Sequence, residues 1–206
     1  LHISFSSGLS GGCSNVMAGA RDICEENPDA KIIVIDTLNA SLGEGIFVIK
    51  AVEMKEEGKT IDEIASWLEE HKMNFSTFFT VNDLYHLQRG GRISKTTALI
   101  GSIMNMKPIL YINEEGGLVP LTTIRGRKKS LSTIFNYMID NMGRYKDDND
   151  IICIAHGDAP DDAMYLKRLI KEALPHKKIL INTISPSIGS HSGPGAIGLC
   201  FMGEKR

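Results

Sequence analysis

One histidine, His191, lies in a stretch rich in glycine, proline and serine, residues 189–195, between two apolar runs at residues 178–184 and 196–201. Such a cluster between strand-like runs is typical of a loop. Near neutral pH a histidine can donate a hydrogen bond or carry positive charge, and loops on a rigid scaffold often carry binding residues. We therefore predict that His191 and Ser192 contact a ligand. The alternative is a glycine-rich turn with a solvated histidine.

A second loop of matching chemistry, residues 6–12, contains Ser6, Ser7 and Gly8. It follows a short strand-like run, and the residues after it have the spacing of one helix face. At a strand–turn–helix junction, the free N–H groups and the positive end of the helix dipole suit a phosphate or carboxylate. The loop has neither the Walker lysine nor the Rossmann glycine spacing. It is a candidate anion site, or else a helix N-terminus with nothing bound. The apolar helix positions are Val16, Ala20, Ile23 and Cys24.

Arg92 is a further candidate, because it follows a pair of glycines that end a short helix and precedes Ser94, which we expect to cap the next one. A guanidinium at such a rigid junction can fork onto a carboxylate or phosphate. It can equally form a structural ion pair with an aspartate such as Asp83.

Arg125 and Arg127 belong to a basic run, residues 125–129, that follows a strand and starts a helix. Most of this charge is expected on a solvated face. A sharper alternative is that one arginine turns inward, or that the cluster meets an acidic partner.

Composition excludes several classes of protein. The chain has 206 residues, 42% of them hydrophobic, so it can bury a real core. A net charge of −2 provides no basic field for nucleic acid, and no apolar run is long enough to span a bilayer. The four cysteines lie far apart without a Cys-x-x-Cys pair, which favours buried thiols in a reducing compartment over zinc ligands. We expect a cytoplasmic protein without a metal or cofactor. Because Leu1 is not an initiator methionine, we also expect a processed or truncated N-terminus.

Alternating strand and helix patterns predict an α/β fold. Capping-box sequences at residues 41–44 and 60–63 predict two helix starts. Residues 107–112 and 118–124 flank a glycine-containing turn and predict a β-hairpin. The other expected strands are residues 2–5, 31–35, 74–81, 151–155, 178–184 and 196–201, and the other expected helices lie around residues 131–138 and 166–173.

The order of these elements predicts two lobes. Residues 1–72 read as a βαβα parallel-sheet lobe, and residues 73–206 as a mixed-sheet α/β lobe that contains the hairpin. We expect the ligand site between them.

Taken together, these residues resemble the DegV family of bacterial fatty-acid-binding proteins. The matching segments run in order from end to end of the chain. They are residues 3–11, 34–37, 41–43, 83–87, 90–94, Gly101, 107–110, the region around Arg125 and Arg127, 191–195 and Gly198. One departure is large: family members have an additional N-terminal strand and a Thr-Ser-x-Pro-Ser segment that helps hold the ligand head group. We therefore expect either a fragment or an incomplete site.

The resemblance implies two α/β lobes that bury one long-chain fatty acid between them. It implies that the carboxylate is held by the serine turn, matched by Ser6 and Ser7, and by the loop histidine, matched by His191. Arg92, Arg125 and Arg127 are expected near the head group or at the surface that meets a partner kinase. In characterised bacterial systems that kinase phosphorylates the bound acid to an acyl phosphate for phospholipid synthesis. The chain would then be a substrate-carrying subunit and not a catalyst.

A fatty acid needs one anion pocket and a long apolar tube. Each buried methylene contributes about 0.8 kcal/mol, so a sixteen-carbon tail offers on the order of ten kcal/mol before ordering costs. Residues near the lobe junction could line the tube, with plain core packing as the alternative. They are Ile93, Leu99, Ile100, Ile103, Met104 and Met106.

Two other classes stay open at this point. One is a serine hydrolase or esterase with His191 as base, although the Gly-x-Ser-x-Gly elbow is absent and no acidic partner for His191 is evident. The other is a regulatory module that senses a small phosphorylated or carboxylated ligand in the same pocket.

Overall fold

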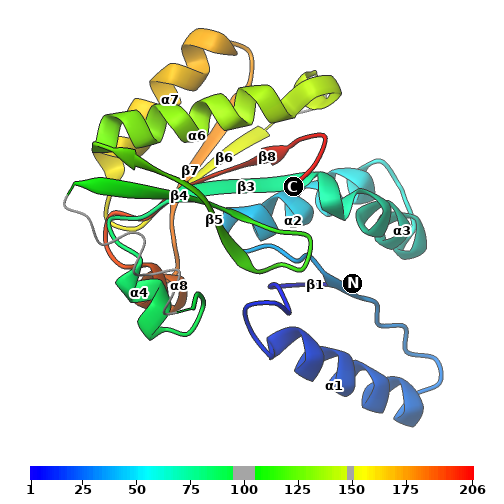
Figure 1. Cartoon of the computed structure of the whole chain (residues 1–206). Helices are drawn as coiled ribbons and strands as arrows, with labels where there is room; N and C mark the ends of the chain where they lie inside the picture. Colours follow the sequence, from blue (N-terminus) through cyan, green and yellow to red (C-terminus); the bar gives the residue numbers. More distant parts are fainter. Residues whose placement is uncertain (95–104, 148–150) are drawn as a thin grey trace.

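A computed structural model describes residues 1–94, 105–147 and 151–206. A six-stranded mixed sheet forms its centre, in the order β5-β4-β3-β8-β6-β7 (Figure 1). Only β6 and β7 pair in parallel; the other neighbours are antiparallel. The strands are β3 (Phe75–Thr80), β4 (Met106–Ile112), β5 (Leu118–Arg125), β6 (Ile151–His156), β7 (Lys178–Thr183) and β8 (Ile197–Met202).

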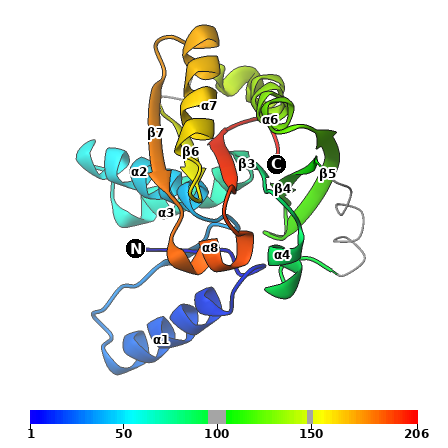
Figure 2. The same cartoon turned by 90° about the vertical axis from the view of Figure 1, so that its left-hand side faces the viewer.

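A second, two-stranded sheet pairs β1 (His2–Ser4) in parallel with β2 (Val34–Asp36), so that Ile3 lies opposite Ile35. The crossover between these strands contains α1 (Gly12–Glu26), which lies at the periphery, away from the large sheet (Figures 1 and 2). Its predicted apolar stripe is not a core face: Ile23 is 48% exposed, and Cys13 is the buried residue of the helix.

Helices cover both faces of the large sheet (Figure 1). On one face lie α6 (Arg127–Met142) and α7 (Pro160–Ala173), whose apolar residues pack with Phe78 and Phe201 of the sheet. On the other face lie α2 (Leu42–Glu56) and α3 (Ile61–His71), together with the small sheet.

The second core joins the two predicted lobes. The ring of Phe47 from α2 stacks on Phe75 of β3 with centroids 3.9 Å apart, and Cys153 and Cys200 belong to the same cluster. The proposed boundary at residues 72 and 73 lies just before β3, within the short 3-10 turn Lys72–Asn74, and α2 packs across it. The small sheet is therefore held against the large one by buried apolar surface.

Two short helices, α4 (Tyr85–Arg89) and α8 (Pro186–Ser192), lie side by side at one end of the large sheet (Figures 1 and 2). No helix in the described part of the chain is long and apolar enough to cross a membrane.

The predicted α/β class with a parallel and a mixed sheet is confirmed, and so is the hairpin of β4 and β5. The capping box at Thr60 is also confirmed: Glu63 N–H donates to the Thr60 hydroxyl, and Thr60 N–H donates to the Glu63 carboxylate at 2.7 Å.

Two local predictions are wrong. The Ser41 side chain caps no helix, because Ser41 has a φ of 55° and its hydroxyl makes no cap bond. Residues 189–192, expected as part of a loop, belong to α8. Ser185 caps that helix by accepting from Ile188 N–H, and Pro186, whose missing N–H is not needed there, occupies its first turn.

Candidate functional site

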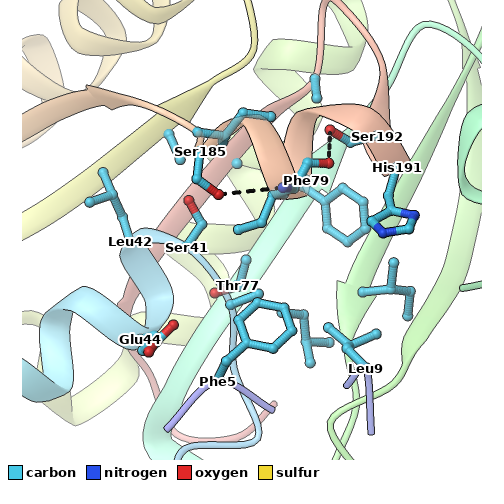
Figure 3. Close-up of a pocket in the computed structure, with 18 of the residues that line it drawn as sticks. Phe5, Leu9, Ser41, Leu42, Glu44, Thr77, Phe79, Ser185, His191 and Ser192 are labelled. Carbon is cyan, nitrogen blue, oxygen red and sulfur yellow. Dashed lines mark hydrogen bonds between the residues drawn. The ribbon is translucent and has the colours of Figure 1, made fainter. Parts of the chain in front are cut away.

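A cavity of about 540 Å³ lies between the large sheet and the segments around the small sheet. Its walls come from the serine turn, the start of α2, strands β3 and β8, the hairpin, and α8 (Figure 3). Apolar side chains dominate these walls, among them Phe5, Leu9, Leu42, Phe79 and Ile188. This volume and character are typical of a small-molecule site.

The half-buried His191 imidazole lines this cavity from the last turn of α8. It lies directly against Gly90, where a Cβ would overlap its Nδ1 atom. Among the described residues no side chain forms a hydrogen bond with His191, and the Nδ1 atom of its ring faces Gly90. Ser192 also lines the cavity, but its hydroxyl already donates to the Ile188 carbonyl at 3.1 Å.

A second histidine makes the reciprocal contact, from α4 to the glycine that follows α8. The ring of His86 in α4 lies against Gly193, which follows α8 and has a φ of 74°. Each of the two short helices thus places an imidazole on a glycine of the other segment. A side chain at either glycine would overlap the imidazole that packs on it, so this packing fixes where His191 lies.

Arg92 lines the same cavity and joins two of the predicted segments. Its guanidinium donates to the Gly90 carbonyl at 2.5 Å and to the Leu9 carbonyl, in the serine turn, at 3.0 Å. It makes no ion pair with Asp83, whose carboxylate instead accepts from Tyr85 N–H. Arg92 therefore brings positive charge to the wall between the serine turn and His191.

Ser6, Ser7 and Gly8 are not among the cavity's lining residues. The fully buried Ser6 hydroxyl donates to the Gly116 carbonyl at 2.9 Å and accepts from Gly8 N–H. Ser7 N–H donates to the Asp36 carboxylate at 3.2 Å. From this turn, the cavity is lined by Leu9 and Ser10 instead.

Arg125 and Arg127 also lie outside the main cavity. Arg127 turns inward at the start of α6, where it pairs with Asp162 at 2.8 Å and donates to the Gly195 carbonyl. Arg125 is exposed at the end of β5. The structure therefore brings together Arg92, His191 and Ser192 of the predicted site, and leaves the other five residues beside it or behind its walls.

The structure describes only two of the residues predicted to line an apolar tube, Ile93 and Met106. Leu99, Ile100, Ile103 and Met104 lie outside the described residues. Ile93 packs in a small cluster with Leu84 and Leu87, and neither Ile93 nor Met106 lines the cavity.

Sequence reasoning missed the residues on the opposite wall, above all Glu44 and Thr77. Residues 41–44 have the sequence pattern of a helix cap, and helix starts that follow a strand often face a binding site. Burial raises the pKa of the Glu44 carboxyl above its ordinary value. The cavity thus has a cationic or hydrogen-bond-donating side at Arg92 and His191 and a separate carboxyl at Glu44.

This arrangement can hold one anionic group attached to an apolar body. Within the described residues no serine hydroxyl forms a hydrogen bond with His191, the pairing that activates a serine nucleophile.

Comparison with known proteins places this geometry in context. The DegV family model, described as uncharacterised proteins of that family, matches residues 1–204. The DegV domain-containing protein CPE0026 of Clostridium perfringens is 43% identical over all of this chain and 70% of its own length. Protein DegV of Bacillus subtilis is 33% identical over 98% of this chain and 69% of its own.

Solved structures share the fold. A DegV family protein from Thermus thermophilus, described as binding fatty acid, is 29% identical with a TM-score of 0.81, over 97% of this chain and 69% of that one. The fatty acid binding DegV family protein SAG1342 from Streptococcus agalactiae is 29% identical with a TM-score of 0.79, over 98% and 69%. The Fatty Acid Kinase (Fak) B3 protein of Streptococcus pneumoniae, loaded with linoleic acid, has a TM-score of 0.88 over 97% and 70% at 22% identity, a likeness of fold alone.

Proposed function

Because the chain belongs to the DegV family, we propose that it binds a long-chain fatty acid in the cavity between its two sheets. The observation that carries this proposal is the apolar cavity itself, with His191 and Arg92 on one side of it. Two solved relatives at 29% identity, from Thermus thermophilus and Streptococcus agalactiae, bind fatty acid and support the assignment.

His191 holds the carboxylate as a hydrogen-bond donor and not as a general base. A carboxylate taken out of water needs charge-assisted or well-aligned donors, since an unpaired buried anion is costly. Arg92 adds positive charge nearby while keeping the serine turn close to Gly90.

The remaining predicted contact residues are also part of the proposal. In this structure each of them either makes another interaction or lies outside the cavity. Ser6 would have to release Gly116, Ser7 faces solvent beside the negative Asp36, and the Ser192 hydroxyl is bonded within α8. Arg125 and Arg127, with Gly8, lie outside the cavity and would act on a ligand only through its surroundings.

The apolar walls bind the tail. Burial of each methylene contributes about 0.8 kcal/mol, so a long acyl chain gains far more from this cavity than a small anion does. This difference separates the proposal from a module that senses small anions.

We further propose that the chain is a cytoplasmic binding protein that presents its fatty acid to a partner kinase for acyl-phosphate formation. Its sequence contains no nucleotide-binding loop. The isolated chain should therefore neither hydrolyse ATP nor phosphorylate a lipid. Acyl phosphate made by the purified chain alone would contradict this role.

Titration of delipidated protein with hexadecanoate tests the binding proposal. Gly198 provides a blocking variant, because it lines the cavity and a Cβ there would meet only Phe79 at 3.7 Å. Gly198→Leu should abolish binding, whereas Gly19→Leu, at an uncrowded position in α1, should not. Equal affinity of the two variants, or tight binding of acetate, or turnover of a nitrophenyl ester would each overturn the assignment.

A further inference from the structure

Glu44 is a carboxyl group in an apolar cavity, on the side away from His191 (Figure 3). It lies in the first turn of α2, and its neighbours along the wall include Phe5 and Leu42. No hydrogen bond or ion pair joins its carboxyl to another residue in ranges 1–94, 105–147 and 151–206. A leucine would serve a simple apolar wall better, because a half-buried carboxylate loses hydration without gaining a partner.

Ser41 adds a second polar group on the same side. Its hydroxyl caps no helix and forms no hydrogen bond with any other described residue, although Ser41 immediately precedes α2. Figure 3 shows it near Ser185, on the side of the cavity away from His191. Neither Ser41 nor Ser185 carries positive charge that could offset the carboxylate.

The two sides of the cavity therefore have opposite electrostatic effects on a bound anion. On one side, Arg92 and His191 offer a guanidinium and an imidazole. On the other, the ionised form of the Glu44 carboxyl repels a second negative group, and the low polarity of the surrounding walls strengthens that repulsion. A neutral acyl tail is indifferent to this charge.

We propose that Glu44 is a specificity-determining residue that orients the ligand and restricts it to acyl chains with a single anionic group. The inference rests on the proposed fatty-acid function and makes it narrower: the ligand class is linear monocarboxylic acids, and dicarboxylic acids of similar length are rejected. Glu44 excludes a carboxylate from the tail end of the cavity and has no part in holding the head group.

The test compares mono- and dicarboxylic acids in matched proteins. Delipidated wild-type protein, Glu44→Gln and Glu56→Gln are titrated with hexadecanoic acid and with a series of linear saturated diacids bracketing hexadecanedioic acid. The pH is about 8, where carboxyl groups are ionised. Glu56 is an exposed residue of the same helix, so its variant removes the same charge away from the cavity. Thermal melts establish that all three proteins are folded.

We expect wild-type protein and Glu56→Gln to reject the diacids. In Glu44→Gln the diacid-to-monoacid ratio of Kd should fall by about tenfold or more, because the repulsion between residue 44 and the second carboxylate is removed. The ratio should fall most for the diacid whose second carboxylate reaches residue 44.

An unchanged ratio at every chain length, or an equal fall in Glu56→Gln, would overturn the inference. If Glu44→Gln folds poorly, Glu44→Leu replaces it with the same expected result. Failure of wild-type protein to bind hexadecanoic acid would instead overturn the proposed function, so the two failures are distinguishable.

Discussion

The imidazole of His191 lies so close to Gly90 that any side chain at residue 90 would overlap its Nδ1 atom. Gly90 has a φ of −74°, a conformation that alanine adopts without strain. The glycine is therefore needed for the space that it leaves, and not for its backbone freedom. This contact holds the proposed head-group donor in place.

The contact predicts that Gly90→Ala displaces the imidazole while leaving the fold intact. Affinity for hexadecanoate should fall by roughly tenfold or more, since a hydrogen bond to a charged group is lost. Titration calorimetry measures this, with Gly19→Ala as the control because a Cβ at residue 19 meets nothing within 4 Å. The loss should not add to that of His191→Ala in the double variant; full additivity would disconnect the two residues.

His191→Ala should itself weaken fatty-acid binding by about 1.5–3 kcal/mol, the range for a hydrogen bond to a charged group. The thermal midpoint should change little, since His191 is half-buried and makes no hydrogen bond with a described residue. His191→Gln, which keeps a donor, should recover part of the affinity. Unchanged binding would remove His191 from the site, and loss of folding would make it a structural residue.

Much of this fold can be predicted from the sequence, because several of its elements are specified by local residue patterns. The hairpin of β4 and β5 and the helix start at Thr60 are encoded locally, by a glycine-containing turn and by a reciprocal pair of side-chain hydrogen bonds. Local signals of this kind do not depend on the rest of the chain.

The sequence is least informative for residues whose surroundings come from distant segments. Ser6 is buried because the hairpin turn supplies Gly116 as its partner, 110 positions away. His191 lies in a helix that begins after Ser185 and Pro186, a pair typical of a helix start. The glycines at residues 189, 193 and 195 favour a loop and conceal this signal in the sequence. Glu44 faces the cavity because α2 packs on the large sheet. No local sequence pattern encodes this packing.

A pH prediction follows from Glu44. Burial raises the pKa of its carboxyl in the folded protein. The folded state therefore binds this proton more tightly than the unfolded state, and the resulting stabilisation is present at low pH and is lost as pH rises through the folded pKa. Glu44→Gln should therefore raise the thermal midpoint more at neutral pH than in acid. Differential scanning calorimetry across this range checks it; an equal shift at all pH values would contradict the assignment.

The thiols give a prediction about accessibility. Cys24 is half-buried, whereas Cys13, Cys153 and Cys200 are buried. Burial raises the pKa of the Cys200 thiol to about 12, and burial together with the neighbouring Cys200 raises that of Cys153. An aromatic disulfide reagent should therefore label native protein rapidly only at Cys24, and Cys24→Ser should remove the fast phase. Fast labelling of Cys153 or Cys200, identified by peptide mapping, would show that the core opens.

Mass spectrometry of the ligand extracted from natively purified protein tests the central claim most directly. The protein is purified without detergent, its intact mass is measured under native conditions, and the bound molecule is extracted and identified. We predict one long-chain monocarboxylic fatty acid per chain, absent from the Gly198→Leu variant. A small phosphorylated or carboxylated metabolite in the same stoichiometry, or a lipid that remains bound to Gly198→Leu, would contradict the account.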